Sequence, residues 1–589
     1  KMKLYTLKNK KVLITLLLVL LVFCFSISAL AENGFQVGYS YGQRLKTDIS
    51  SNINCFFKTV EEKGKNYQNL LNHAKLIENL YQEILPEKIS WMKGLADATG
   101  ISYEKILMFN TVDRPVFDFC NECTTFVAVG KSTKNGVTII AKNRDLGAIT
   151  LSELGLHVRQ EHSPKEIYKA AYIDIPQVAE TCKFIGSRTA GRWGYGQGIN
   201  EYQVSVAAND APTRDMLKFT KGLHDNDLIR LVLERSKTAR ESVDVIADLV
   251  SKYGIAWNGN IFEVGDPNEV WIIEIAGKRW VAKCYKDAIL AFSNQYQITD
   301  DYDLAAPDLI DYAVGQDWVP EGTKKINFRE IYSTDVLYPE DNKPKEAVYP
   351  LYNTKIRYER AMQLLESKDG EITVADMITF MRDHYDTLTL PSGKVIELNQ
   401  VPYYSSKYAN LSDLEWQVEF PKTDKVEIPL YFYSICNHNI TGKTCSSVVL
   451  VSRPNIPDEI GGVMWSLFGQ PCQSVYVPFY SGVTKLPEMY TTTQACVKFE
   501  SIRVRAHGSY NLFEEGIRKI FAPFEDQTIK LAAIVEKEAV ELIKIGKKQE
   551  AIKLITDFSD SRAMSAYYLI NKVQDEMTKA AVNSSKWSR

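Results

Sequence analysis

Cys123 and Asp145 could work together as a nucleophile and its partner. Cys123 stands where the first strand of a predicted hairpin starts, and Asp145 stands where its second strand ends. The residues after Cys123 and those before Asp145 form two β-branched, apolar runs, with Asn135-Gly136 between them. An Asn-Gly pair in this position is a strong hairpin signal. The open ends of a hairpin lie together, so the thiol is expected beside Lys142 and Asp145. A thiol near a cation and a carboxylate favours a nucleophile with orienting groups; the alternative is a core hairpin that begins with cysteine.

The cysteines and histidines give no strong metal signature. Cys120 and Cys123 form a lone C-x-x-C, which would fit a redox pair or half of a zinc site, but no second pair accompanies it. The seven histidines are scattered, and no H-E-x-x-H occurs. We therefore expect neither a metal nor a cofactor.

The first 31 residues are typical of a targeting segment. Lys8, Lys10 and Lys11 precede an apolar run from Val12 to Ala31, which ends in a small-x-small sequence. This pattern predicts a signal peptide over 1–31 and an exported or envelope protein; an uncleaved anchor is the alternative. We expect no other membrane span. The net charge of −3 includes this basic segment, so the remainder is acidic and lacks the basic character of a nucleic-acid-binding protein.

Export would permit disulfides among the cysteines that remain after Cys24 in the signal segment and Cys123 are set aside. Cys436 and Cys445 flank a polar loop and are the best candidates for a bridge. The alternative is that these cysteines are buried free thiols.

The chain has four predicted regions: the signal segment 1–31, a helical leader over 32–122, a catalytic domain over 123–510 and a helical extension over 511–589. Within the catalytic domain, apolar spacing predicts one amphipathic helix from Asn226 to Tyr253, ended by Gly254. The length and the apolar content allow a large core, and self-association of chains stays open.

Several motifs together resemble the N-terminal nucleophile (Ntn) hydrolases that use cysteine. The first is Cys123-Thr-Thr at a strand start, followed by Asn-Gly and Ala-Lys-Asn-Arg-Asp145. A second group, around Ser434 to His438 and Thr444 to Leu450, resembles PepD-type dipeptidases and secernins. The leader is similar to that of isopenicillin N acyltransferase-like proteins. The resemblance implies an α+β fold, a four-layer αββα sandwich of two stacked sheets between helical layers.

The resemblance also implies roles for individual residues. Cys123 would be the nucleophile, freed by cleavage after Glu122, with its new α-amine as the base. Asn294 and Asn209 would stabilise the oxyanion, and Asp145 would hold the amine or the ammonium group of the substrate. Lys142 (many relatives carry Arg here), Asn143 and His438 would contact substrate; His438 could equally be a structural loop residue.

The expected function is hydrolysis of dipeptides or short peptides through a thioester. The long leader keeps open an amidase or acyltransferase acting on N-acyl amides. A non-enzymatic envelope protein that retains the fold without processing is the third hypothesis.

Overall fold

The structure is a computed structural model. It describes residues 34–62, 64–84, 86–111, 123–146, 150–161, 167–169, 174–176, 180–215, 222–256, 259–333, 345–384, 387–389, 395–397, 415–420, 423–429, 434–438, 443–506 and 510–583. The predicted signal segment, Glu122 and Cys120 lie outside these residues.

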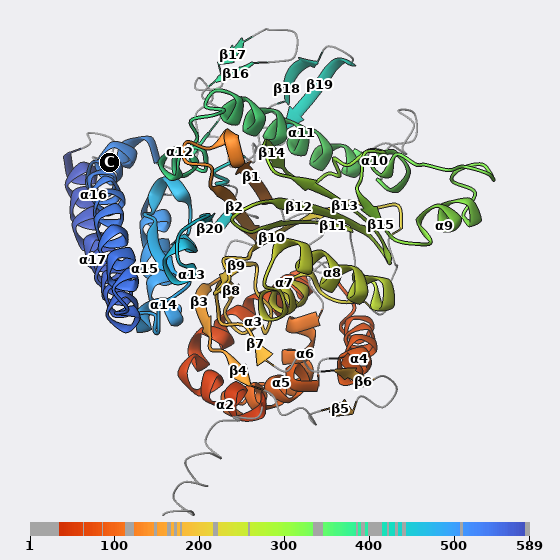
Figure 1. The fold of residues 1–589 in the computed structure, drawn as a ribbon, viewed down its shortest axis with the longest axis horizontal. Helices are drawn as coiled ribbons and strands as arrows, with labels where there is room; N and C mark the ends of the chain where they lie inside the picture. Colours follow the sequence, from red (N-terminus) through yellow and green to blue (C-terminus); the bar gives the residue numbers. More distant parts are fainter. Residues whose placement is uncertain are drawn as a thin grey trace, which may run out of the picture.

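Two antiparallel sheets form the centre of the molecule (Figure 1). The first, which carries Cys123, contains in spatial order β14 (Ala288–Phe292), β1 (Cys123–Val129), β2 (Thr138–Leu146), β20 (Lys443–Ser452), β21 (Val463–Phe468) and β22 (Val477–Tyr480). The second contains β15 (Leu304–Ala305), β13 (Arg279–Tyr285), β12 (Val270–Ala276), β11 (Gly259–Gly265), β10 (Ser205–Ala211), β9 (Gln197–Asn200), β8 (Phe184–Thr189) and β3 (Ser152–His157). The sheets pack face to face, with β1, β2 and β20 against β9, β10 and β11.

Helices cover the outer face of each sheet (Figure 1). The first sheet is covered by α11 (Lys345–Glu366), α12 (Val374–Phe380) and α15 (Gln494–Ala506), and the second by α7 (Asp225–Arg235) and α8 (Ala239–Tyr253). Because both faces are covered, inner strands such as β1, β11 and β20 are buried along their whole length. The predicted αββα sandwich is confirmed.

Two long helices, α16 (Tyr510–Lys544) and α17 (Lys548–Asn583), pair with each other and lie against β22 and α15 (Figure 1). They confirm the predicted helical extension. The remaining elements of the two-sheet region are short: η2 (Gly130–Ser132), α9 (Leu309–Gly315), α10 (Phe328–Tyr332), α13 (Asp458–Gly461), η6 (Pro471–Gln473), α14 (Glu488–Thr491), and the ribbons β4 (Gln160–Glu161) with β7 (Glu180–Thr181), β5 (Ile167–Lys169) with β6 (Asp174–Pro176), β16 (Thr387–Thr389) with β17 (Val395–Glu397) and β18 (Glu415–Phe420) with β19 (Thr423–Pro429). Among the described helices, none has the length and apolar composition needed to cross a bilayer.

The leader forms five helices: α2 (Gly34–Arg44), α3 (Lys46–Glu62), α4 (Tyr67–Ile84), α5 (Pro86–Thr99) and α6 (Tyr103–Thr111). The closest packing in it is between α2 and α5. A Cβ on Gly38 would lie 2.0 Å from the carbonyl oxygen of Trp91, and a Cβ on Gly94 would lie 2.0 Å from that of Phe35. Only glycine permits this approach, which makes the leader a compact unit.

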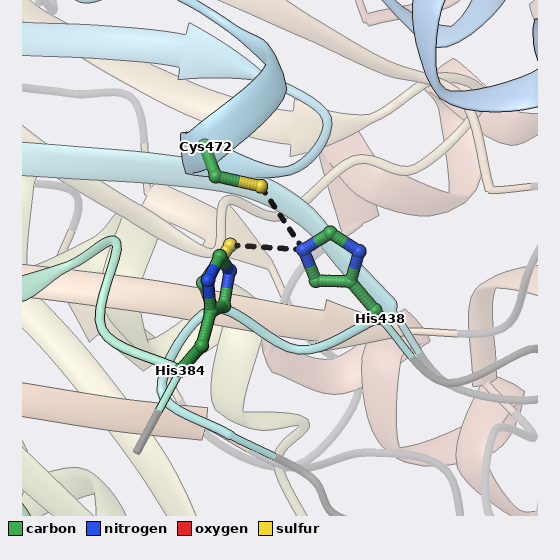
Figure 2. A group of neighbouring side chains, drawn as sticks. His384, His438 and Cys472 are labelled. Carbon is green, nitrogen blue, oxygen red and sulfur yellow. Dashed lines mark hydrogen bonds between the residues drawn. The ribbon is translucent and has the colours of Figure 1, made fainter. Parts of the chain in front are cut away.

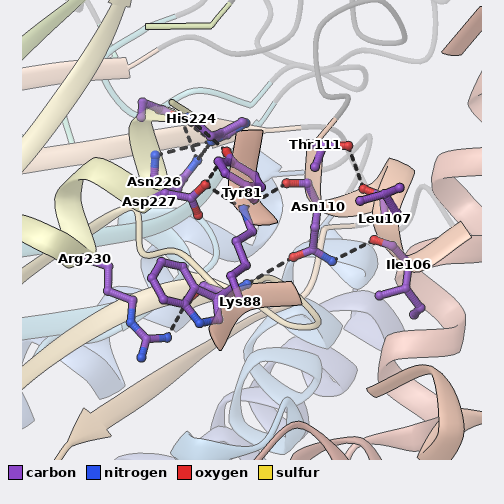
Figure 3. Close-up of polar contacts among 12 residues, drawn as sticks. Tyr81, Lys88, Ile106, Leu107, Asn110, Thr111, His224, Asn226, Asp227 and Arg230 are labelled. Atoms are coloured by element: carbon purple, nitrogen blue, oxygen red, sulfur yellow. Dashed lines mark hydrogen bonds and ion pairs between the residues drawn. The ribbon is translucent and has the colours of Figure 1, made fainter. Parts of the chain in front are cut away.

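The leader is joined to the catalytic domain by a buried polar network around Asp227 (Figure 3). The Lys88 ammonium and the Tyr81 hydroxyl each lie 2.6 Å from the same Asp227 oxygen, and both members of the Lys88–Asp227 ion pair are almost fully buried. Asn110 donates to the carbonyl oxygen of Gly191 at 3.1 Å. These contacts fix the leader against the start of α7.

We expect Lys88→Met to lower the free energy of unfolding by about 3–5 kcal/mol, because it leaves the Asp227 carboxylate buried without its cation. Lys75 is the matched control, since it pairs with Glu104 within the leader but on the surface. Lys75→Met is expected to cost less than about 1 kcal/mol. Urea unfolding of both variants measures the two values, and equal losses would contradict the assignment.

Candidate active site

Cys123 begins β1, and Asp145 lies near the end of β2, as predicted. Cys123 pairs with Arg144 across the two strands, and Thr125 pairs with Lys142. Directly opposed residues of an antiparallel pair point to the same side. These four side chains therefore face the second sheet, where Thr125 donates to Asn209 Oδ1 at 3.0 Å.

The Cys123 thiol is buried, with 8% of the residue exposed. Burial raises the pKa of this thiol to about 11; Lys142 acts in the opposite direction, and the charges of Asp145 and Asp210 add to the rise. At neutral pH the thiol therefore keeps its proton, and a nucleophilic role requires a base beside it.

The backbone of Cys123 is held on both sides of its Cα. Its N–H donates to Asn294 Oδ1 at 3.2 Å. The guanidinium of Arg357 donates to the carbonyl oxygen of Cys123 at 2.5 Å, to Thr124 Oγ1 at 2.9 Å and to Asn294 Oδ1 at 2.8 Å. Arg357 is fully buried in α11, so one cation holds both the Cys123 carbonyl oxygen and the Asn294 side chain.

The two candidate oxyanion residues differ in position. Asn294 follows β14, which pairs with β1, so its side chain reaches Cys123 directly, and its Nδ2 donates to the carbonyl oxygen of Asp210 at 2.8 Å. Asn209 lies in β10 and donates to the carbonyl oxygen of Ser293 at 3.2 Å. The structure thus places Asn294 at the thiol-bearing residue and Asn209 one layer away, beside Thr125.

Lys142 faces the second sheet and is buried. Its ammonium donates to the carbonyl oxygen of Gly196 at 3.3 Å and to that of Ala208. Across from it lies Glu263 in β11, a fully buried carboxyl group to which no other residue of the described chain donates a hydrogen bond. Burial raises the pKa of Glu263 to about 8, although Lys142 lowers it. Near neutral pH this carboxyl is therefore largely protonated.

The raised pKa of Glu263 predicts a loss of stability as pH rises from 4.5 to about 8. Below pH 4.5 the carboxyl is protonated in both the folded and the unfolded chain. As pH rises from 4.5 to 8, only the unfolded chain releases the proton, so the free energy of unfolding falls, by at most about 5 kcal/mol. Glu263→Gln should remove this part of the pH dependence. Urea unfolding at pH 5, 7 and 9 measures it, and identical slopes in both proteins would contradict the prediction.

Arg144 supports the same face of the first sheet. Its guanidinium donates to Thr189 Oγ1 at 3.1 Å and to Asn226 Oδ1 at 3.2 Å, next to the residue that receives Lys88 from the leader. A Cβ on Gly196 would lie 2.7 Å from Arg144 Nε, so the glycine-rich loop before β9 leaves the space that Arg144 fills. Arg144, which faces the same side as Cys123, therefore contacts the same end of α7 that the leader contacts through Lys88.

Asp145 is fully buried at a bulge between β2 and β20. It accepts hydrogen bonds from Thr444 Oγ1 at 2.7 Å and from Asn437 Nδ2 at 3.2 Å. These donors orient the carboxylate close enough to Cys123 for its charge to raise the pKa of the thiol.

Two predicted substrate contacts point elsewhere. Asn143 lies on the helical side of the first sheet, where its amide donates to the carbonyl oxygens of Met381 and Ile435. His438 is buried, with Nε2 3.0 Å from Cys472 Sγ and 3.5 Å from Cys436 Sγ. No contact in the described chain supports a substrate role for either residue, which stays a prediction.

The expected bridge between Cys436 and Cys445 is wrong. Neither cysteine forms a disulfide, and none of the other cysteines in the described part of the chain does so. Cys445 lies within β20 and its thiol faces the carbonyl oxygen of Arg144 at 3.3 Å, while Cys436 faces His438.

Comparison with known proteins identifies the family to which this chain belongs. Residues 122–507 match the family model "Peptidase family C69", and the match begins one residue before Cys123. A probable dipeptidase of Latilactobacillus sakei is 25% identical over 67% of this chain and 82% of its own length. Probable dipeptidase B of Streptococcus pyogenes serotype M1 is 23% identical over 62% of this chain and 74% of its own length.

Among solved structures, a penicillin V acylase from Agrobacterium tumefaciens is similar with a TM-score of 0.30 and 14% identity, over 63% of this chain and 88% of that one. The family match spans most of the chain and covers both sheets and their helices. The chain therefore belongs to peptidase family C69 and is a hydrolase that acts on peptide bonds.

Proposed function

We propose that this protein is an exported, self-processing dipeptidase that cleaves dipeptides or short peptides through a thioester on Cys123. The observation that carries the proposal is the pair of hydrogen bonds that holds the Cys123 backbone: Asn294 accepts from its N–H, and Arg357 donates to its carbonyl oxygen. The backbone nitrogen that would become the α-amine already has an acceptor, and the family match starts at this point in the chain.

The first step is cleavage of the Glu122–Cys123 bond. The Cys123 sulfur attacks the Glu122 carbonyl carbon and the peptide C–N bond breaks, which leaves a thioester and the Cys123 amine. Water then hydrolyses the thioester, so the products are a carboxylate on Glu122 and a free thiol and amine on Cys123. Asn294 Oδ1, which accepts from this nitrogen in the uncut chain, would hold the new amine.

Turnover then uses the amine as the base. An α-amine has an ordinary pKa of about 7.7–8, so a useful fraction is neutral near neutral pH and can accept the thiol proton. The thiolate attacks the substrate carbonyl, the amine returns the proton to the leaving amino group, and water resolves the acyl thioester. An Asn amide has two N–H donors; one Asn294 donor bonds the carbonyl oxygen of Asp210, and we assign the other to the oxyanion.

The charged groups around the thiol suit a small, charged substrate. Asp145 is held by Thr444 and Asn437, so its charge is fixed beside Cys123, where it can bind an ammonium group. Lys142 lies close enough to lower the pKa of the thiol, although its donors are used on backbone carbonyls. A dipeptide carries a free α-amine next to the carbonyl group that is attacked, whereas an N-acyl amide with a fatty or aryl acyl group carries no amine there.

We further propose that the leader stays bound after the cut. The buried network around Asp227 (Figure 3) does not depend on the bond before Cys123. The same holds for the docking of α2, in which the Tyr41 hydroxyl donates to Glu153 at 2.7 Å. The processed enzyme would then be a complex of two chains.

Export is proposed from the lysine-rich start, the apolar run and the small-x-small end of the segment 1–31. Cleavage there would leave a mature protein that begins near Glu32. N-terminal sequencing of material secreted by a bacterial host tests this proposal.

A substrate panel tests the reaction. Purified protein is incubated with unmodified dipeptides, the same dipeptides carrying an N-acetyl group, and fatty-acyl and aryl-acyl amides. The proposal expects hydrolysis of the unmodified dipeptides and a large loss on acetylation. Turnover confined to the acyl amides would overturn it and indicate an amidase.

A further inference from the structure

A compact group of sulfur and nitrogen ligands lies in the first sheet's helical layer, away from the thiol of Cys123. His384 follows α12, Cys436 and His438 precede β20, and Cys472 lies in η6. One potential ligand atom from each of the four side chains lies within 4.8 Å of all the others. Figure 2 shows His384, His438 and Cys472 converging on one point.

The distances suit a four-coordinate ion. In a tetrahedral zinc site, bond lengths of about 2.3 Å to sulfur and 2.0–2.1 Å to nitrogen place the ligand atoms roughly 3.3–3.8 Å apart. His438 Nε2 lies 3.5 Å from Cys436 Sγ and 3.0 Å from Cys472 Sγ. The whole group is therefore within about 1 Å of the required geometry, and small side-chain rotations would complete it.

The burial and the charge also suit a divalent cation. Cys436, His438 and Cys472 have 0%, 5% and 3% of their surface exposed. Two buried thiolates would be costly alone, but with one divalent cation and two neutral imidazoles the site carries no net charge. Two thiolates with two imidazoles is a ligand set typical of structural zinc. A disulfide between the two cysteines would not account for two imidazoles within the same few ångströms.

The segments that carry these ligands are already tied together. The Cys436 N–H donates to the carbonyl oxygen of Asp383 at 3.1 Å, and Gln470 Nε2 donates to the carbonyl oxygen of Asn437 at 3.2 Å. Arg382 Nε donates to the carbonyl oxygen of Pro471 at 2.8 Å. These hydrogen bonds connect the three segments that carry the four side chains. They hold the segments together before any ion binds, which preorganises the group.

We propose that His384, Cys436, His438 and Cys472 form a structural zinc site that fixes the loop carrying Asn437. Four protein ligands leave no open position for water or substrate, so the ion acts on structure. Asn437 stands between two of the ligands, and its side chain donates to Asp145 at 3.2 Å. Asn437 N–H also donates to Thr444 Oγ1 at 3.0 Å, and this hydroxyl donates to the other Asp145 oxygen. The ion would therefore hold both donors of Asp145.

The first test measures metal and does not use activity, so it stands apart from the proposed reaction. The full chain is reduced, loaded with Zn²⁺, freed of excess ion and analysed for metal and for protein. We expect one zinc per chain, and loss of most of it in Cys472→Ser and His438→Asn. Cys182→Ser is the matched control, a buried free cysteine outside the group, and should retain zinc. Cys123→Ala should also retain it.

Cobalt keeps the test decisive where a variant fails to fold. Wild-type protein loaded with Co²⁺ should show thiolate-to-cobalt charge-transfer bands and the intense visible bands of tetrahedral cobalt. A reduced, folded wild-type chain that binds neither ion would overturn the proposal. So would a disulfide between Cys436 and Cys472 found by peptide mapping of metal-free protein.

The proposed effect of the ion on Asp145 is tested by measuring kcat/KM, and this test rests on the proposed function. Removal of the ion should lower kcat/KM by roughly tenfold or more, and added Zn²⁺ should restore it. If the metal-free protein keeps its full activity, the zinc site itself stands, but the proposed role of the ion in positioning Asp145 is overturned.

Discussion

Replacement of Cys123 by alanine is expected to lower kcat/KM for a dipeptide by at least ~10⁴-fold, because the nucleophile is lost while the fold is kept. The side chain is small and buried at a strand start, and its backbone contacts to Asn294 and Arg357 do not involve the thiol. The loss should therefore appear in activity and not in the melting temperature. Initial rates on a dipeptide and thermal unfolding measure the two effects.

Cys182→Ser controls for the removal of a buried thiol, since Cys182 lies between β7 and β8 and its thiol donates to the carbonyl oxygen of Ser236 at 3.9 Å. It should retain activity. Dipeptide hydrolysis at the wild-type rate by Cys123→Ala would remove Cys123 from the mechanism.

Asn294→Ala is expected to lower kcat by roughly 10²–10³-fold, the usual cost of losing one oxyanion donor, and to exceed the effect of Asn209→Ala. The reason is position: Asn294 contacts the backbone of Cys123, whereas Asn209 contacts Thr125 and the carbonyl oxygen of Ser293. The two variants remove the same side chain from two buried sites, so each is the other's control. Steady-state kinetics of both variants on one dipeptide decide the order.

The reverse order, with Asn209→Ala the more damaging substitution, would move the oxyanion to the second sheet. Equal small effects would mean that neither amide contacts the developing charge.

The hairpin was predictable because its signals are local. An Asn-Gly turn and two apolar runs place Cys123 opposite the segment that ends in Asp145, and the register Cys123–Arg144 confirms this. The position of Asn294 was given by resemblance, since nothing local states that β14 pairs with β1. Strand order depends on long-range packing, which the sequence does not show directly.

Arg357 is the residue that sequence reasoning missed. It lies in the second half of α11. In α11 it shares one stripe with Ala361 and Leu365, which follow at helical spacing and are also fully buried. An arginine on the apolar stripe of a helix is uncommon unless it has partners, and this was the available signal. Its partners come from distant segments, so their identity was not readable.

One other expectation failed for a local reason. The single helix predicted from Asn226 to Tyr253 is broken into α7 and α8, because Thr238 accepts from the Glu241 N–H and starts a new helix. Apolar spacing continued through the break and concealed it. The four ligands of the proposed zinc site are separated by 52, 2 and 34 positions in the chain, so no ligand motif could be recognised beyond Cys436-x-His438.

The central claim, self-processing at Cys123, is tested most directly by intact mass and N-terminal sequence of the purified wild-type protein beside Cys123→Ala. Wild type should yield a chain that begins at Cys123 and a separate leader that co-elutes with it. Cys123→Ala should remain uncut between residues 122 and 123. A wild-type chain that stays in one piece while hydrolysing dipeptides would contradict the account, because Cys123 would then have no α-amine to act as its base.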